Sequence, residues 1–549
     1  NEQRIYRERG WQPDSFIAQQ FKRKVMAGEI IGFSASPNTY AMELVLLGGI
    51  AAGLAAQRIA DRDEWGWATV IIISLAPAIV MLWYTECRAA FVTPIFAAGI
   101  VAALALHVGG RRRRTWFWGI VLIIAIGVAG LIGFGLSHGS LVHDSLTFRW
   151  WYWIGSMRIV AKHPLLGVGF ANFADHYLAV RLPVASEEIR DPHNFFIRIL
   201  SETGIIGAAL LVAWMMRMAW EQTAPPRPRK PGPPLPHSPL TLLFFLAIGV
   251  IVLNIAVSVD FSQSVAYISI EILKRIMWGG LLLIGQVVGT LKLSEDQIND
   301  SRPAPWIRWA ILGSLAAFVL HNTIEFGFFE SGPLGLFALL CGALLGVSSD
   351  GAERNGNWAI SIAAIIGWLA AAFFWVFPIV RGEGFAQEGD DVLQSNRADG
   401  AVQNYRDAIA TLPVADAPLL LRTATAQMYA GAMPSEVLGT LDRTTIADPN
   451  FIRGYLTRAE YELRFSTPDL ERVRQDYERA IALNPNDVAV RTDYAGLLER
   501  MGDSGGALRE YDAALAANAG LSKDEPKRLS AKQVDDLNDR VKRLQALQR

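Results

Sequence analysis

Two arginines and one histidine are the residues of this sequence best suited to carry out chemistry. Arg88 stands at the end of an apolar window of membrane length, and Arg149 opens the aromatic run of residues 150–153. A guanidinium donates several hydrogen bonds in one plane and keeps its charge where solvent is scarce, which suits it to a diphosphate. His193 can accept a proton near neutral pH, which is what a sugar hydroxyl needs before it attacks. Taken alone, such an arginine is more often a snorkelling anchor and such a histidine a packing residue, so the surrounding sequence decides.

Arg149 and His193 lie in a long polar interruption, residues 137–203, between two apolar windows. The interruption contains Pro-Leu-Leu-Gly-Val-Gly-Phe at 164–170 and Asp-Pro-His-Asn at 191–194. An exposed spacer has little use for so many aromatic and apolar residues. We therefore expect this loop to pack back onto the membrane part and to form a site.

Four pieces in this order resemble the bacterial O-antigen ligase and polymerase superfamily. They are the arginine with aromatic residues at 149–153, the motif at 164–170, His-Asn at 193–194, and Glu-Thr-Gly at 202–204 before an apolar window. The resemblance covers roughly residues 30–378 and leaves out the C-terminal third. It implies a membrane glycosyltransferase that moves a glycan from a polyprenyl-diphosphate donor to an acceptor hydroxyl, with no metal ion and no other cofactor.

The resemblance also implies roles for single residues. The ligases have arginines that hold the donor diphosphate at positions matching Arg88 and Arg149, and His193 is the expected base for the acceptor. Cys87 stands where the family usually has serine. Further substrate-binding residues are predicted in the loop: Arg190, Asn194, Tyr177 and Glu202. Arg190 could equally pair with a neighbouring glutamate, and Glu202 could fix the loop.

Several functions share these motifs. A lipid A core acceptor makes the protein a ligase, another lipid-linked glycan makes it a polymerase, and a protein side chain makes it an O-oligosaccharyltransferase. A transporter is a second class, although paired broken helices are not evident. A non-catalytic scaffold for envelope assembly is a third.

Composition predicts a polytopic, all-α membrane protein. Of 549 residues, 52% are hydrophobic although the last third is polar, and the net charge of −1 gives no nucleic-acid footprint. Cys87 and Cys341 have no metal-ligand spacing and predict no disulfide. Ten candidate spans lie near residues 41–57, 67–84, 90–108, 116–136, 204–220, 240–259, 276–291, 307–321, 334–348 and 358–378.

Positive charge in the short loops predicts the orientation. The run Arg111–Arg114 indicates the cytoplasmic side, which puts the loop 137–203 and the whole C-terminal region in the periplasm of a bacterial inner membrane. Residues 1–40 are read as a polar periplasmic segment, and the resemblance implies further helices before Asn1. The proline-rich residues 224–239 are read as a stiff linker.

From about residue 383 the sequence changes to charged helical repeats. Tyr405, Tyr477 and Tyr511 occupy equivalent places in three similar segments, 72 and then 34 residues apart. This period resembles tetratricopeptide repeats over residues 383–520, followed by a charged helix over 521–549. Such an α-solenoid predicts a protein partner on its concave face. Because all candidate catalytic residues precede it, we expect it to be separable from the chemistry.

Overall fold

The computed structural model describes residues 36–61, 65–106, 110–141, 144–185, 187–222, 305–348, 358–521 and 527–547, with a few isolated positions besides. Every regular element in these ranges is a helix, which confirms the all-α prediction. The linker at 224–239 and the windows at 240–259 and 276–291 lie largely or wholly outside the described residues.

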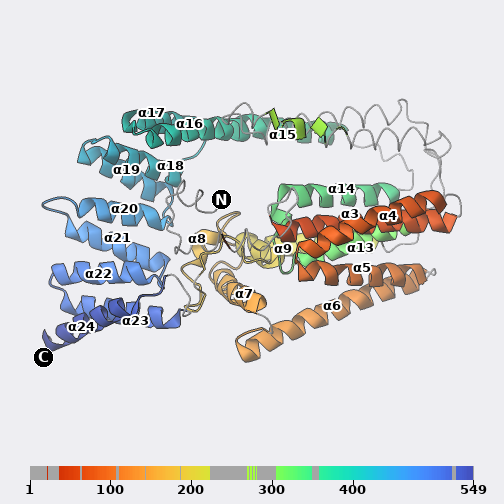
Figure 1. Ribbon diagram of the computed structural model, residues 1–549, viewed down its shortest axis with the longest axis horizontal. Coiled ribbons are helices and arrows are strands. Elements are labelled where there is room, and N and C mark those ends of the chain that lie inside the picture. Colours follow the sequence, from red (N-terminus) through yellow and green to blue (C-terminus); the bar gives the residue numbers. More distant parts are fainter. Residues whose placement is uncertain are drawn as a thin grey trace.

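The apolar helices form one end of the molecule (Figure 1). They are α3 (Pro37–Asp61), α4 (Trp65–Tyr84), α5 (Arg88–Leu106), α6 (Gly110–His138), α9 (Phe195–Gln222), α13 (Pro305–His321), α14 (Ser331–Ser348) and α15 (Trp358–Ala371). Each overlaps one of the predicted spans. The segments Pro37–Asp61, Val121–His138, Phe195–Glu221 and Leu369–Gln394 are long and apolar enough to cross a membrane, and four shorter apolar helices accompany them within the described ranges.

Helix α13 is the centre of this bundle. It packs on α3 and α5, and most of its residues are buried, including Trp309, Leu312 and Phe318. A helix that is apolar on all sides is expected where neighbours surround it. The last turn of α13 therefore brings the following loop, residues 322–330, to the middle of one end of the bundle.

The long loop between α6 and α9 is itself folded. It contains α7 (Asp144–Lys162) and the short α8 (Phe173–Tyr177), and α7 packs against α9. The aromatic residues that marked this loop in the sequence form a core of their own around Trp150, Trp153 and Phe173. Burial of these rings explains why an extramembrane loop carries them.

A continuous helical rod joins the bundle to the repeats along the top of Figure 1. It runs through α15, a π-helical turn (Ala372–Val376) and α16 (Phe377–Gln394). The predicted span at 358–378 thus does not end in a loop. The chain enters its first repeat helix without a break.

The C-terminal part is a stack of helices. They are α17 (Ala398–Thr411), α18 (Ala417–Tyr429), α19 (Pro434–Ala447), α20 (Ile452–Glu462), α21 (Leu470–Leu483), α22 (Val488–Arg500), α23 (Ser504–Gly520) and α24 (Ala531–Leu547). The three equivalent tyrosines of α17, α21 and α23 are all buried. Aspartates cap the N-termini of α18, α21, α22 and α23 by accepting a hydrogen bond from the third helical residue.

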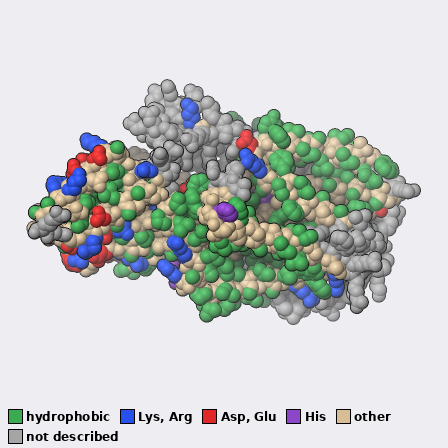
Figure 2. Space-filling view, turned by 90° about the horizontal axis from the view of Figure 1, so that it is seen from below, with side chains coloured by type: hydrophobic (Ala, Val, Ile, Leu, Met, Phe, Trp, Pro, Cys, Tyr) green, Lys and Arg blue, Asp and Glu red, His purple; other side chains and the backbone are tan. Residues whose placement is uncertain are grey.

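The surface changes character along the long axis. Charged side chains gather over the repeat end, whereas hydrophobic side chains cover much of the opposite end (Figure 2). Within the bundle, exposed apolar residues such as Ile73, Ile95 and Leu210 point outward. An apolar belt of this kind is what a lipid-facing surface requires.

Candidate active site

The motif at 164–170 holds the loop against α9 through backbone contacts. Val168 N donates to Ser201 O at 3.0 Å, and Ile205 N donates to Pro164 O at 2.9 Å. Two glycines make this approach possible. A Cβ on Gly167 would lie 2.4 Å from Glu202 C, and one on Gly204 would lie 2.2 Å from Leu165 O.

Both glycines also adopt backbone conformations that disfavour other residues. Gly167 has φ 67° and Gly204 has φ 66°. Gly204 interrupts the helical geometry of α9 and so divides it into a part before residue 204 and a part after it. The predicted span at 204–220 corresponds to the second part alone.

The segment before α9 fixes the position of His193. Its backbone N–H donates to Asp191 Oδ1 at 2.7 Å, and its φ of 50° places it in the left-handed region. Trp153 Nε1 donates to Pro192 O at 3.0 Å, and Asn194 Nδ2 donates to Thr323 O at 2.6 Å. Contacts on both sides therefore tie the histidine to α7 and to the loop after α13.

Glu325, in the loop after α13, joins the two predicted catalytic residues. Arg149 Nη2 donates to Glu325 Oε1 at 2.5 Å, and His193 Nδ1 lies 3.6 Å from Oε2. Asn38 Nδ2 also donates to Oε1, at 2.8 Å. The carboxylate is thus hydrogen-bonded to Arg149 and Asn38, whereas His193 lies within ion-pair distance of it without a hydrogen bond. A carboxylate at this distance can supply a counter-charge when the imidazole gains a proton.

Opposing influences act on the pKa of the Glu325 carboxyl. Burial raises it, while the contact with His193 and the charge of Arg149 together outweigh burial and hold the pKa below its ordinary value. Glu325 is therefore an anion at neutral pH. Arg149 Nε donates in addition to Ile324 O at 2.9 Å, so the guanidinium is held by the backbone as well.

A cavity of about 630 Å³ opens beside this cluster. Arg88, Arg149 and Glu325 all line it, as do Asn38 and Thr93. The structure thus places the two predicted diphosphate-binding arginines on one cavity, although they come from α5 and α7. Its size suits a diphosphate together with part of a sugar.

Aromatic rings enclose His193. Its ring centroid lies 5.1 Å from that of Phe326 and 6.2 Å from that of Tyr152. The His193 side chain is 32% exposed while its Nδ1 is buried, so the accessible edge of the ring is the one away from Glu325.

The other predicted loop residues have different surroundings. Asn194 caps α9 by accepting from Ile197 N at 3.1 Å, and Glu202 is fully buried against Arg198, 3.1 Å away. Tyr177 is completely buried. The geometry of these three supports loop-fixing roles, and substrate contact by them finds no support in it. Arg190 is exposed and has no ion pair within the described ranges.

Glu325 is the residue that sequence reasoning undervalued. It stands at the end of an apolar window and in none of the motifs named above, and a charge at such a place is costly unless it is paired or lines a cavity. The structure shows both conditions, since Glu325 is 4% exposed, paired, and part of the cavity wall. Asn38 and Cys87 line the same wall. In the described residues no group of three or more His, Cys, Asp or Glu side chains could hold a metal ion.

Taken together, these features define a polytopic helical membrane protein with a folded extramembrane loop over a charged cavity. One region of the chain, residues 72–212, matches the O-antigen ligase family. It includes α7, the motif at 164–170 and His193. The predicted family resemblance is confirmed.

A curated protein is similar to part of this chain. An O-antigen ligase of Pseudomonas aeruginosa is 32% identical over 148 residues, which is 27% of this chain and 33% of that protein. The chain thus spans about a third of the length of this relative. Two solved structures of the MamA protein also align with part of this chain. The first covers 30% of this chain and 89% of the MamA chain, at 16% identity and a TM-score of 0.23. The second covers 29% of this chain and 92% of the MamA chain, at 17% identity and a TM-score of 0.22.

Proposed function

We propose that the protein transfers a glycan from a polyprenyl-diphosphate donor to an acceptor hydroxyl at the periplasmic face of the membrane. The observation that carries this proposal is the cavity lined by Arg88, Arg149 and Glu325; His193 does not line it, but its Nδ1 lies 3.6 Å from the Glu325 carboxylate that does. Two arginines suit the two phosphates of such a donor, and a histidine paired with a carboxylate suits the activation of a hydroxyl.

In the proposed reaction, His193 takes the proton of the acceptor hydroxyl as its oxygen attacks the anomeric carbon of the donor sugar. A new C–O glycosidic bond forms, and the bond between that carbon and the diphosphate oxygen breaks. The electron pair leaves with the diphosphate, where the two arginines offset the growing negative charge. Glu325 stabilises the imidazolium of His193 until the proton is released. One displacement of this kind inverts the anomeric configuration.

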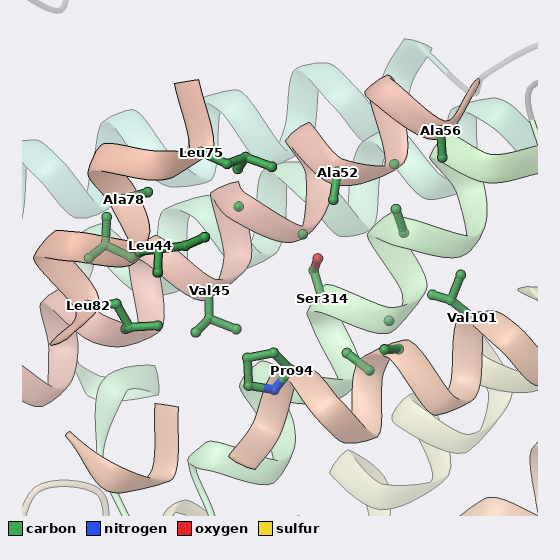
Figure 3. A pocket seen from close by; sticks show the side chains of 18 of the residues that line it. Leu44, Val45, Ala52, Ala56, Leu75, Ala78, Leu82, Pro94, Val101 and Ser314 are labelled. Atoms are coloured by element: carbon green, nitrogen blue, oxygen red, sulfur yellow. The ribbon is translucent and has the colours of Figure 1, made fainter. Parts of the chain in front are cut away.

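An apolar groove next to the cavity offers a place for the prenyl chain. It has a volume of about 460 Å³ and lies between α3, α4, α5 and α13 (Figure 3). Pro94 lines this groove and its neighbour Thr93 lines the charged cavity, so α5 contributes to the walls of both. Leu44, Val45 and Leu82 give the groove walls that a hydrocarbon chain can cover (Figure 3).

The proposal requires the loop and the repeats to be periplasmic. The arginine run at 111–114, which opens α6, supports this orientation, because basic residues beside a span favour the cytoplasmic side and the loop follows the other end of α6. Reporter fusions after Ser140 and after Gly389 should both behave as periplasmic. Cytoplasmic behaviour of the fusion after Ser140 would remove the site from its substrates.

Transfer is best tested with purified protein in detergent or vesicles and a radiolabelled polyprenyl-diphosphate glycan. Three acceptors are offered separately: lipid A core, a second lipid-linked glycan, and a protein that carries exposed serine residues. The acceptor that becomes labelled distinguishes a ligase, a polymerase and an oligosaccharyltransferase. Labelling of none of them, with donor binding absent as well, would contradict the proposal and favour a scaffold.

A further inference from the structure

The repeats contact the extramembrane loop through a buried arginine. Arg181, which follows α8, is only 4% exposed, and its Nη2 donates to Asn484 Oδ1 at 3.2 Å. Asn486 Nδ2 donates back to Arg181 O at 3.3 Å. Both asparagines lie between α21 and α22. A buried guanidinium needs hydrogen-bond partners, and here the repeat domain supplies one of them.

Two further contacts extend this interface along the same stretch of loop. Lys527 Nζ lies 2.5 Å from Glu188 Oε1. A Cβ added to Gly520, at the end of α23, would lie 3.6 Å from Pro183 Cβ. The repeat end thus makes polar contacts with the loop at Arg181 and Glu188, and Gly520 lies close to Pro183 between them. The sequence had given no sign of this contact.

The same stretch of loop reaches the candidate active site. Glu187 accepts a hydrogen bond from Tyr152 OH, and the Tyr152 ring lies beside that of His193. Arg158 Nη1, also on α7, donates to Val180 O at 3.0 Å. Burial and the hydrogen bond to Glu187 raise the pKa of the Tyr152 hydroxyl, so it stays a neutral donor in this contact. A path of direct contacts therefore runs from the repeats to the ring that flanks His193.

We propose that the repeat domain is a clamp on the loop, and that Arg181 and Glu187 are positioning residues for the face of His193 that receives the acceptor. Docking of the repeats orders residues 178–185 and the adjoining Glu187. Glu187 in turn holds Tyr152 against His193. The positioning role rests on the proposed function, whereas the clamp itself does not.

A cysteine pair tests the docking. Pro183→Cys with Gly520→Cys places two Cβ atoms at a separation that suits a disulfide, while native Cys87 and Cys341 are buried. The full-length double variant should form an intrachain disulfide under mild oxidation, and either single variant should not. Absence of the disulfide in a folded double variant would overturn the docking.

An undocking variant tests the clamp. Lys527→Glu with Asn486→Ala removes two contacts without changing the loop. Lys542→Glu is the matched control, because within the described part of the chain the ion pair of Lys542 is with Asp539 on its own helix α24. Loss of one hydrogen bond and reversal of one exposed charge should speed hydrogen exchange of residues 178–185 on the order of tenfold. The control should leave it unchanged, and the disulfide at 183 and 520 should restore protection.

Transfer kinetics then test the positioning role. The undocking variant should raise the KM for the acceptor several-fold while donor binding stays as in the wild type, and the disulfide should reverse the change. Faster exchange with an unchanged KM would leave the clamp standing and overturn the positioning role. Exchange equal to that of the control would overturn the clamp. If the wild type transfers nothing, the proposed function fails, and the disulfide and the exchange rates still decide the docking.

Discussion

Replacement of Glu325 by glutamine is the perturbation that most directly probes the site. Glutamine keeps the size of the side chain and one oxygen that can accept from Arg149 and Asn38. It removes the negative charge that faces His193. The Glu325→Gln variant should therefore fold and bind donor nearly as the wild type does, but turn over slowly.

The separation of the two groups sets the size of the effect. Opposite charges 3.6 Å apart attract by roughly 4–5 kcal/mol at an effective dielectric constant of about 20. Two effects reduce this attraction to roughly 2–3 kcal/mol. Arg149 already pairs with the other carboxylate oxygen, and the His193 side chain is 32% exposed to solvent. This loss of stabilisation for the imidazolium in the transition state lowers turnover on the order of 10² fold.

The assay compares single-turnover rates and donor affinity in three proteins. Glu330→Gln is the matched control, because Glu330 lies in the same loop and accepts a hydrogen bond from Thr39 at 2.7 Å. Among the described residues it is hydrogen-bonded neither to Arg149 nor to His193. The control should keep its rate within about threefold of the wild type, as is usual for changes away from the reacting groups. A Glu325→Gln rate as high as that of the control would refute the dyad.

The remaining predictions concern the other parts of the site. Replacing either cavity arginine with lysine keeps the charge but loses the planar fork, so equilibrium binding should show weaker donor affinity, and unchanged affinity would count against the diphosphate site. His193→Ala should leave donor binding nearly intact and lower turnover by about 10² to 10⁴ fold in a rate assay. Unchanged turnover would mean that another group acts as the base. Gly204 has φ 66°, and a Cβ added to it would lie 2.2 Å from the carbonyl oxygen of Leu165. Gly204→Ala should therefore lower the free energy of unfolding by roughly 2–4 kcal/mol. Gly127→Ala should not lower it, because a Cβ added to Gly127 meets no atom within 4 Å. Because the pKa of Glu325 is lowered on folding, its contribution to stability is present above the unfolded carboxyl pKa and lost as pH falls through the lowered value. Unfolding measured against pH should show this decline in the wild type and a smaller one in Glu325→Gln.

The sequence predicted those parts of the fold that follow from local pattern. Apolar windows located the helices because a membrane-spanning helix must be apolar over its length, and the repeat period located the buried tyrosines. Aromatic residues in the loop correctly indicated that it packs. The start of α9 was harder to predict from the sequence, because the part of the helix before Gly204 is short and this glycine, with its positive φ, divides the helix.

The site was predictable only in part, for a similar reason. Arg149 and His193 stand in local motifs that can be recognised, whereas Glu325 and Asn38 stand in no motif and acquire meaning only through contact. Nothing local indicates that Arg181 meets Asn484, since the bond joins residues 303 positions apart. The roles of Asn194 and Glu202 needed coordinates too, because a polar residue beside a catalytic one serves equally well as a helix cap or as a ligand contact.

The position of Glu325 also constrains how the site can form during synthesis. Its bonds to Asn38 and Arg149 span 287 and 176 residues of sequence. A chain emerging from the ribosome has inserted α3 to α9 well before α13 is made, and until then the guanidinium of Arg149 has no Glu325 to meet. Contacts of such high sequence separation form late in folding. The catalytic cluster is therefore assembled only after α13 has entered the bundle, and no shorter nascent chain carries a complete one.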